Sequence, residues 1–212
     1  EIGNELTKLN ELNGVAFTGS TIAAKSINLN LAKSEGPIKS LIAETGGQNA
    51  MFVDSSSLKE QVIDDVIRSA FYSSGQRCSA LRVVFVQEDI AQEYWEYLNE
   101  AMQEIKVGDP QKPQTDIGPI INKNSISKLR DHVAKLKKLG KEFIETKGEF
   151  EKHSFFMNPI AFKIDSIKEI DGEKFGPVLH FISYKTSELD NLINEVNETG
   201  FGLTMGVQSR IH

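Results

Sequence analysis

The chain has 212 residues, of which 39% are hydrophobic and 25% charged, so it can bury a sizeable core in one large or two small domains. Its net charge of -6 argues against a nucleic-acid-binding protein, because such surfaces need clustered lysine and arginine. No apolar run approaches the roughly 20 residues of a membrane-spanning helix, no signal-peptide pattern opens the sequence, and one cysteine excludes an internal disulfide and indicates a reducing, cytoplasmic location.

Short apolar runs alternate with amphipathic helical patterns, which favours an α/β fold with a parallel sheet covered by helices. The predicted elements, in chain order, are a strand at 15–17, a helix at 21–33, strands at 41–43 and 50–53, a helix at 58–71, a strand at 81–86, helices at 90–105 and 126–139, strands at 143–144, 160–162 and 178–184, a helix at 187–198 and a strand at 205–207. A long ordered loop is predicted at 107–119.

Three local signals refine these elements. Ser57 and Glu60 have the spacing of a capping box at the start of a helix. Trp95 shares one helix face with apolar residues and is predicted to be core rather than a platform for a ligand. Gly140 is the predicted helix stop.

The glycine pair Gly46-Gly47 separates two predicted strands and can act as a hinge, so it predicts a border between domains at residues 1–46 and 47–212. The chain begins without methionine, and it ends just after a predicted strand. We therefore expect it to be a piece of a longer protein.

Cys78 is the only cysteine, and it lies between a predicted helix and an apolar strand. Small residues on both sides, including Gly75 and Ser79, allow ligand or backbone atoms to approach closely. A free cysteine is often buried and inert, so packing and nucleophilic catalysis both remain open on this evidence.

Three further groups of residues could carry chemistry. Gly19 and Ser20 join a strand to a helix start, where a phosphate could bind, although a plain helix cap explains the same residues. Glu44 ends a strand and could be a general base or merely a solvated carboxylate. Glu173 and Phe175 lie in a turn before a strand, and alone they would be unremarkable.

The order of these segments is more specific than any one of them. Phe-Thr-Gly-Ser-Thr at 17–21, Glu-Thr-Gly-Gly-Gln-Asn-Ala at 44–50, Gly-Gln-Arg-Cys-Ser-Ala at 75–80 and Glu-Lys-Phe-Gly-Pro-Val at 173–178 together resemble the aldehyde dehydrogenase superfamily. The resemblance runs from about residue 14 to the end. Thr45, Ser79 and the stretches around them are most similar to the glutamate semialdehyde (1-pyrroline-5-carboxylate) dehydrogenase module of bacterial bifunctional proline utilization enzymes.

The resemblance implies a three-layer, parallel-sheet catalytic domain at 47–212, truncated at its C-terminal end, and the rear part of a Rossmann-like NAD-binding domain at 1–46. It implies that Cys78 is the nucleophile and Glu44 the base that activates water. Gly19, Ser20, Glu173 and Phe175 would bind NAD, Ser79 would contact the substrate, and no metal would be needed. The expected reaction oxidises an aldehyde, glutamate semialdehyde, to a carboxylate through a cysteine thiohemiacetal and a thioester.

The resemblance also implies partners and missing parts. The expected partners are the small aldehyde and, in the parent chain, a proline dehydrogenase domain with FAD; the parent is expected to be a homo-oligomer. In the family an asparagine that completes the oxyanion hole lies upstream of the matching region, and a glycine-rich loop that binds the substrate's carboxylate lies downstream of it. We therefore expect the 212 residues to turn over poorly alone.

Three alternatives stay open. The chain could be an aldehyde dehydrogenase for another substrate class, or a non-catalytic interaction module in which Cys78 is core. A cysteine hydrolase would need a histidine partner. Its candidates are His132, His153, His180 and His212.

Overall fold

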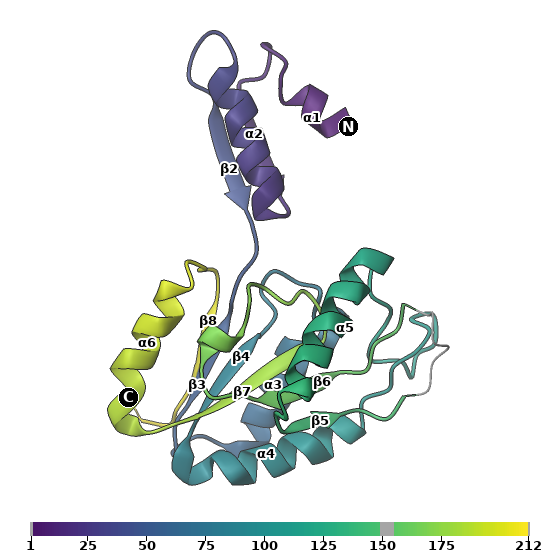
Figure 1. The fold of residues 1–212 in the computed structure, drawn as a ribbon, viewed down its shortest axis with the longest axis vertical. Helices are drawn as coiled ribbons and strands as arrows, with labels where there is room; N and C mark the ends of the chain where they lie inside the picture. The colour runs from purple at the N-terminus through teal and green to yellow at the C-terminus, as the bar shows by residue number, and fades with distance from the viewer. Residues whose placement is uncertain (1, 149–154, 212) are drawn as a thin grey trace. The chain divides into compact units, whose positions relative to one another are not determined.

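The computed structural model describes residues 2–148 and 155–211. It divides into two compact units, residues 1–46 and residues 47–212 (Figure 1).

The first unit is a strand-helix-strand motif preceded by a short helix. Helix α1 (Ile2–Leu6) was not predicted, and it is followed by β1 (Gly14–Thr18), α2 (Thr21–Lys33) and β2 (Ser40–Glu44). Strands β1 and β2 pair in parallel, with Thr18 opposite Glu44. The helix supplies the crossover that two parallel strands require.

The first unit buries little apolar surface. Among its described residues only Thr7, Ala24 and Leu31 are buried, and Ile22, Ile38 and Ile42 are largely exposed. Hydrogen bonds between distant parts of its sequence add to the contacts of this unit, such as those that Asn30 donates to the side chains of Asn4 and Thr7 at 3.0 and 2.9 Å.

The second unit contains a six-stranded sheet in the order β5-β6-β7-β4-β3-β8. Its strands are β3 (Ala50–Val53), β4 (Val83–Gln87), β5 (Phe143–Glu145), β6 (Ile160–Lys163), β7 (Val178–Tyr184) and β8 (Met205–Gln208). Strands β6, β7, β4, β3 and β8 run parallel to one another. The predicted α/β fold with a mostly parallel sheet is confirmed.

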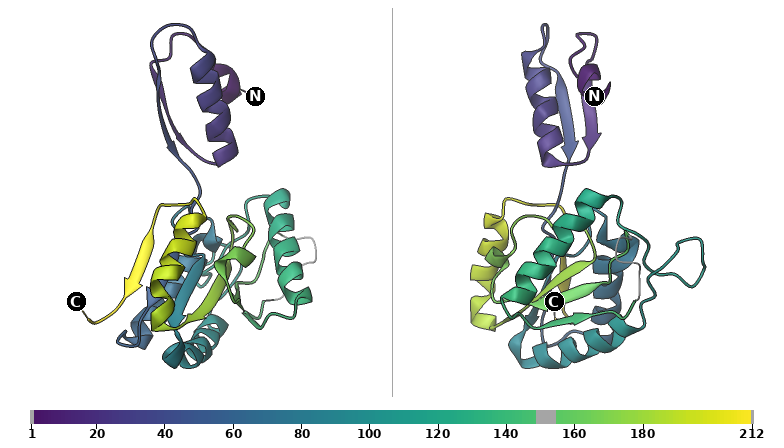
Figure 2. Two further views of the ribbon diagram at one scale, coloured as in Figure 1. Left: turned by 60° about the vertical axis from the view of Figure 1, so that its left-hand side comes forward. Right: turned by 45° about the vertical axis from the view of Figure 1, so that its right-hand side comes forward.

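In the described part of the second unit, four α-helices cover the sheet and three short 3-10 helices lie in the connections. The α-helices are α3 (Lys59–Phe71), α4 (Glu88–Gln103), α5 (Lys123–Lys138) and α6 (Leu189–Glu198), and the 3-10 helices are η1 (Tyr72–Gly75), η2 (Ile167–Glu169) and η3 (Thr186–Glu188). Helices α3 and α4 share one core cluster with the sheet, while α5 and α6 share another, so the unit has three layers (Figure 2).

The strands are apolar on both faces because helices cover both. In β3, Met51 and Val53 belong to the cluster with α3 and α4, whereas Ala50 and Phe52 belong to the cluster with α5 and α6. Successive side chains of a strand point to opposite faces, so a continuous apolar run is needed to fill both cores. Stacking of Phe52 on Phe85, with ring centroids 4.7 Å apart, joins neighbouring strands within the second cluster.

Strand β5 departs from the parallel pattern. It pairs antiparallel with β6, with Phe143 opposite Phe162. The two strands are consecutive in the chain, and no helix is described between them. Antiparallel strands can be joined without a helix, whereas parallel neighbours usually need a crossover helix.

Two of the local predictions are confirmed and one is wrong. Trp95 is buried at 4% exposure and packs edge-on against Phe181. Gly140 has a φ of 72° just past α5, and the next residue's N–H bonds to Leu136 O at 3.2 Å, which closes the helix end.

The capping box expected at Ser57 and Glu60 does not form. Helix α3 begins after Leu58, which makes no side-chain cap. The Ser57 hydroxyl instead donates to Asp54 O at 2.7 Å and is hydrogen-bonded to the Tyr94 hydroxyl at 2.8 Å.

A helix with the length and apolar content needed to span a membrane is not found among the described residues.

Candidate active site

The candidate residues of the second unit gather at the amino-terminal ends of parallel strands. Cys78 precedes β4, Glu173 and Phe175 precede β7, and Asn49 and Thr204 directly precede β3 and β8. Because β7, β4, β3 and β8 are neighbours in the sheet, the loops that enter them are neighbours too. Parallel pairing thus brings together segments that are far apart in the sequence.

The segment before Cys78 has an unusual backbone. Ser73 and Ser74 have φ values of 57° and 56°, in the left-handed region that residues with a side chain rarely adopt. Each such residue costs of order 1–3 kcal/mol unless its surroundings compensate. The Ser74 hydroxyl donates to Gly118 O at 2.8 Å, so the predicted long loop braces the strained turn.

Gln76 adds a second brace to the same loop. Its amide donates to Pro119 O at 3.1 Å and its Oε1 accepts from Ile121 N at 2.8 Å. Hydrogen bonds of Ser74 and Gln76 therefore hold the segment that leads to Cys78 in place.

Asn49 fixes the chain after the thiol. Its amide donates to Cys78 O at 2.7 Å and to Ala80 O at 2.8 Å, and its Oδ1 accepts from Thr204 N at 3.2 Å. One buried side chain therefore joins the entrances to β3, β4 and β8. Cys78 itself is neither fully buried nor fully exposed, and Ser79 is exposed.

Arg82 connects the thiol segment to the loop of Glu173. Its Nη1 donates to Gly75 O at 2.7 Å and to Gly176 O at 3.3 Å. Its Nη2 donates to Arg77 O at 3.0 Å and to a Glu173 carboxylate oxygen at 3.3 Å. The guanidinium carbon also lies 5.4 Å from the centre of the half-exposed Phe175 ring, within cation-π range.

The charge of Arg82 is deeply buried. Its side chain is 1% exposed, and this burial lowers the pKa of its guanidinium group. The charge and hydrogen bond of Glu173 oppose that change, and a thiolate at Cys78 would act in the same direction as Glu173. A buried cation needs such compensation, because removal from water costs several kcal/mol.

The two loops touch backbone to backbone at Gly75 and Gly176. Gly75 has a φ of 62°, and a Cβ built on it would overlap Gly176 O and lie 2.9 Å from Ala70 O. A Cβ on Gly176 would overlap the side chain of Leu129 on α5. The approach of the two main chains therefore requires glycine at position 75, whereas a side chain at position 176 would compete with Leu129 for space.

Two buried histidines, His132 and His180, form a pair, and His180 contacts the backbone carbonyl of Arg82. His180 donates its backbone N–H to Arg82 O at 2.9 Å, and its Nδ1 lies 3.0 Å from the same oxygen. A carbonyl oxygen only accepts, so Nδ1 must carry the hydrogen and Nε2 must accept. His132 Nε2, 2.9 Å from His180 Nε2, is then the donor.

This arrangement of donors and acceptors requires both imidazole rings to be neutral. Burial lowers the pKa of His132 to about 3, with a contribution from His180, and burial lowers the pKa of His180 to about 4. His132 and His180 are therefore engaged with each other rather than with Cys78, which removes them as hydrolase partners. His153 and His212 lie outside the described residues.

In the first unit, the structure brings Gly19, Ser20 and Glu44 together. Gly19 N donates to Glu44 O at 3.0 Å, just past the paired ends of β1 and β2. Ser20 caps α2 by accepting from Ala23 N at 3.2 Å, as the simpler interpretation of this motif expected. That Glu44 shares a cleft with Cys78 stays a prediction.

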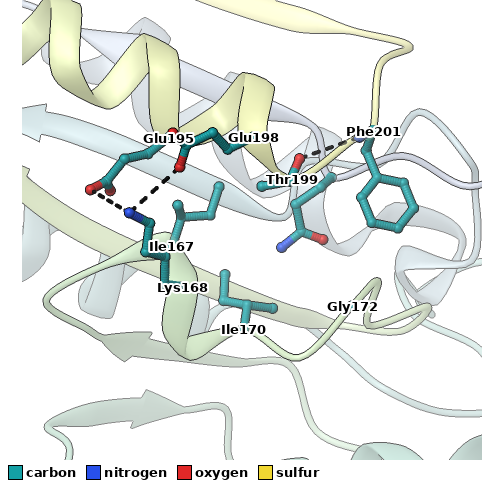
Figure 3. Close-up of a pocket in the computed structure, with 9 residues that line it drawn as sticks. Ile167, Lys168, Ile170, Gly172, Glu195, Glu198, Thr199 and Phe201 are labelled. Atoms are coloured by element: carbon teal, nitrogen blue, oxygen red, sulfur yellow. Dashed lines mark hydrogen bonds and ion pairs between the residues drawn. The ribbon is translucent and has the colours of Figure 1, made fainter.

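A separate pocket of about 360 Å³ contains none of these residues. It is lined by Gln48, Ile167, Lys168, Ile170, Gly172, Glu195, Glu198, Thr199 and Phe201 (Figure 3). Lys168 pairs with Glu195 and Glu198 at 3.4 and 3.6 Å along its wall. Among the described residues, the buried Gln48 Oε1 has no hydrogen-bond partner.

Sequence reasoning missed Asn49, Arg82 and the histidine pair. Arg82 left a visible signal, because a charged residue inside the apolar run 81–86 must find compensation if that strand is buried. Asn49 and the histidines had no comparable local signal.

Comparison with known proteins decides what this arrangement belongs to. A model described as "Aldehyde dehydrogenase family" matches residues 1–211. The chain belongs to the aldehyde dehydrogenase family. A bifunctional protein PutA from Klebsiella aerogenes is 42% identical over 219 residues, covering 99% of this chain and 17% of that relative. A 1-pyrroline-5-carboxylate dehydrogenase from Geobacillus sp. (strain WCH70) is 33% identical, covering 99% of this chain and 41% of that relative.

Solved structures agree with this aldehyde dehydrogenase assignment. A variant of proline utilization A from Bradyrhizobium japonicum superposes with a TM-score of 0.94 at 43% identity, over 99% of this chain and 21% of that one. The resemblance read from the four ordered motifs is confirmed at the level of the family. This chain spans about a fifth of its bifunctional relatives.

The contact between the two loops predicts the effect of Gly75→Ala. We expect this variant to lose about 2 kcal/mol or more in the free energy of unfolding beyond the cost of left-handed backbone, because the methyl group overlaps Gly176 O. Gly140→Ala is the matched control, since its φ is 72° with no atom within 4 Å. It should lose only about 1 kcal/mol. Urea unfolding measures both, and equal losses would contradict the close approach.

The histidine pair predicts stability that depends on pH. Both folded-state pKa values lie below the ordinary 6.5, so the unfolded chain binds more protons in that range. The contribution of the pair to the free energy of unfolding is therefore fully present above pH 6.5. It falls as the pH drops towards 4, by up to about 1.4 kcal/mol per pH unit for each histidine. Urea unfolding at several pH values measures the slope.

The double variant His132→Met/His180→Met is the control for that slope. It keeps all other titrating groups, so the difference between its slope and that of the unmodified chain isolates the pair. We expect a shallower slope between about pH 7.5 and about pH 5. An unchanged slope would show that the pair does not titrate as described.

Proposed function

We propose that this chain carries the thiol chemistry of an enzyme that oxidises L-glutamate γ-semialdehyde to L-glutamate in proline catabolism. The observation that carries the proposal is the setting of Cys78. The thiol is partly exposed, its loop is bound by Arg82 and Asn49, and the Glu173-Phe175 loop lies against it. The relatives named 1-pyrroline-5-carboxylate dehydrogenase and PutA support the choice of substrate.

In this proposal the two units divide the work. Residues 1–46 are the C-terminal part of an NAD-binding domain, and residues 47–212 are the catalytic domain. Glu44 ends β2, the last strand of the first unit, and β3 of the second unit begins at Ala50, so a short stretch of chain connects the two units.

The residues present fit a nicotinamide dinucleotide. Helix α2 begins with a small exposed pair, Gly19-Ser20, and has no acidic residue in its first turn, so its positive end can accept a phosphate. Glu173 is 17% exposed, and within the described residues Arg82 contacts only its Oε1, which leaves Oε2 to accept from a ribose hydroxyl. Phe175 is exposed enough to flank a ring. NAD, when bound, accepts the hydride from the substrate.

Cys78 would supply the nucleophile. Its thiolate attacks the aldehyde carbon, a sulfur-carbon bond forms, and the oxygen becomes an oxyanion within reach of the Cys78 backbone N–H. That N–H does not appear among the backbone hydrogen bonds of the described residues, so it remains available to such an oxygen. Loss of hydride from the same carbon gives a thioester on Cys78.

Glu44 would release the product. A carboxylate that removes a proton from water generates a nucleophile for the thioester carbonyl, and the sulfur leaves as a thiolate. Glu44 is exposed, so water can reach it. The carboxylic acid product carries the oxygen of that water.

Substrate and partners follow from the same proposal. Ser79 is exposed beside Cys78 and would hydrogen-bond the semialdehyde. The aldehyde would come from a proline dehydrogenase domain with FAD in the same protein, working as a homo-oligomer in the cytoplasm.

Substitutions at Cys78 and Glu44 separate the two chemical steps. In a form of the protein that turns over, Cys78→Ser should abolish NADH production. Glu44→Gln should give a burst of about one NADH per site and a trapped thioester, with steady turnover reduced about 100-fold or more. Stopped-flow absorbance and intact mass spectrometry measure the burst and the adduct. Undiminished steady turnover of Glu44→Gln would contradict its assignment as the base.

The 212 residues alone should turn over slowly or not at all. The resemblance assigns part of the oxyanion hole and of the NAD-binding domain to residues beyond this sequence. A steady-state assay with the semialdehyde and NAD tests this, with Cys78→Ser as the blank. Robust multiple turnover would refute the expected inactivity while supporting the reaction.

A further inference from the structure

We propose that Arg82 is a positioning residue whose guanidinium group couples the carboxylate of Glu173 to the reactivity of Cys78. The proposal rests on the proposed function for its biological meaning, since a nucleotide bound at Glu173 would then change the thiol. The coupling itself needs neither nucleotide nor turnover.

The contacts of Arg82 place it between the two groups. It donates to Gly75 O and Arg77 O, in the three residues directly before Cys78, at 2.7 and 3.0 Å. The same guanidinium donates to Glu173 at 3.3 Å. A shift of the carboxylate therefore changes the anchor of the segment that carries the thiol.

The planar fork of the guanidinium is essential to this arrangement. Its two terminal nitrogens serve acceptors in the thiol segment and in the Glu173 loop at the same time. A lysine ammonium presents one nitrogen on a flexible stem and cannot reproduce that geometry. Positive charge without the fork should not restore the coupling.

Charge gives the coupling a direction. Glu173 is the main charge that stabilises protonated Arg82, and a thiolate at Cys78 would act in the same direction to a smaller extent. If Glu173 is neutral, the buried guanidinium keeps its charge with less compensation, and a thiolate at Cys78 becomes a more favourable partner. Because the thiolate is the nucleophile, this increases the rate of attack by Cys78.

A residue that only stabilised the fold would behave differently. Substitution of such a residue lowers the free energy of unfolding but leaves the effect of Glu173 on Cys78 unchanged. The discriminating quantity is therefore the interaction between two substitutions, measured on the thiol of the folded protein.

The experiment is a double-mutant cycle read by alkylation of Cys78. Iodoacetamide modifies the only cysteine of the chain, so intact mass spectrometry gives one rate constant per protein. The proteins are the unmodified chain, Glu173→Gln, Arg82→Met and the double variant, all at one pH near neutrality. We expect Glu173→Gln to raise the rate roughly threefold or more in the unmodified background and to have no effect in the Arg82→Met background.

Arg82→Lys tests the geometry. In that background Glu173→Gln should change the rate much less than it does with arginine present. Full coupling with lysine would overturn the assignment to the guanidinium fork, as would equal effects of Glu173→Gln in the arginine and methionine backgrounds.

A matched control guards against general effects of losing an ion pair. Arg68 and Asp64 form an exposed pair on α3 at 3.0 Å, and Asp64→Asn should leave alkylation unchanged. If the Arg82 variants fail to fold, the comparison of Glu173→Gln with Asp64→Asn decides alone. Equal rates for these two variants would overturn the proposal.

The outcome is independent of the proposed function. Coupling in this chain, together with undiminished turnover of Cys78→Ser or Glu44→Gln in a form of the protein that turns over, would leave Arg82 as the positioning residue and refute the proposed dehydrogenase roles. Oxidation that depends on Cys78 and Glu44 as described, but without coupling, would support the dehydrogenase proposal and overturn the assignment of Arg82 as the positioning residue.

Discussion

The candidate site depends on one buried cation. Arg82 brings a full charge into the interior, where only hydrogen-bond acceptors and a carboxylate can offset the loss of water. Those acceptors come from the thiol segment and from the Glu173 loop, so the requirement to satisfy the guanidinium also fixes the two loops relative to each other. Even so, among the described residues Nε has no partner. The compensation is concentrated on the two terminal nitrogens, which face the candidate site.

Parallel strand pairing explains why these loops can meet at all. Cys78 and Glu173 are separated by almost half of the sequence, yet β4 and β7 are neighbours and both are entered from the same edge. Asn49 performs for β3 and β8 what Arg82 performs for β4 and β7, with neutral amide groups in place of charge. The loops that enter these four strands are thus held together by two side chains, each of which makes hydrogen bonds to several of the loops.

The sequence allowed the prediction of most elements because the relevant physics is local. The run 50–53 is apolar at every position and the run 178–184 at every position except His180 and Ser183, and they form β3 and β7 with those bounds. The antiparallel direction of β5 was not predicted, because three residues contain no directional signal. The capping box failed at Ser57 because the Tyr94 hydroxyl, distant in sequence, competes for the serine. Motif order identified Cys78, Glu173 and Phe175, whereas Arg82 and Asn49 act through contacts that no local pattern encodes.

The meeting of Gly75 with Gly176 has a consequence for how this surface can change. The three atoms nearest to a Cβ on Gly75 all belong to the main chain, so no neighbouring side chain could be shortened to make room for it. Substitutions elsewhere in a core can be balanced by a partner of complementary size, but the Gly75 side of this contact offers no such exchange. The distance between the thiol segment and the Glu173 loop is therefore set by the backbone itself.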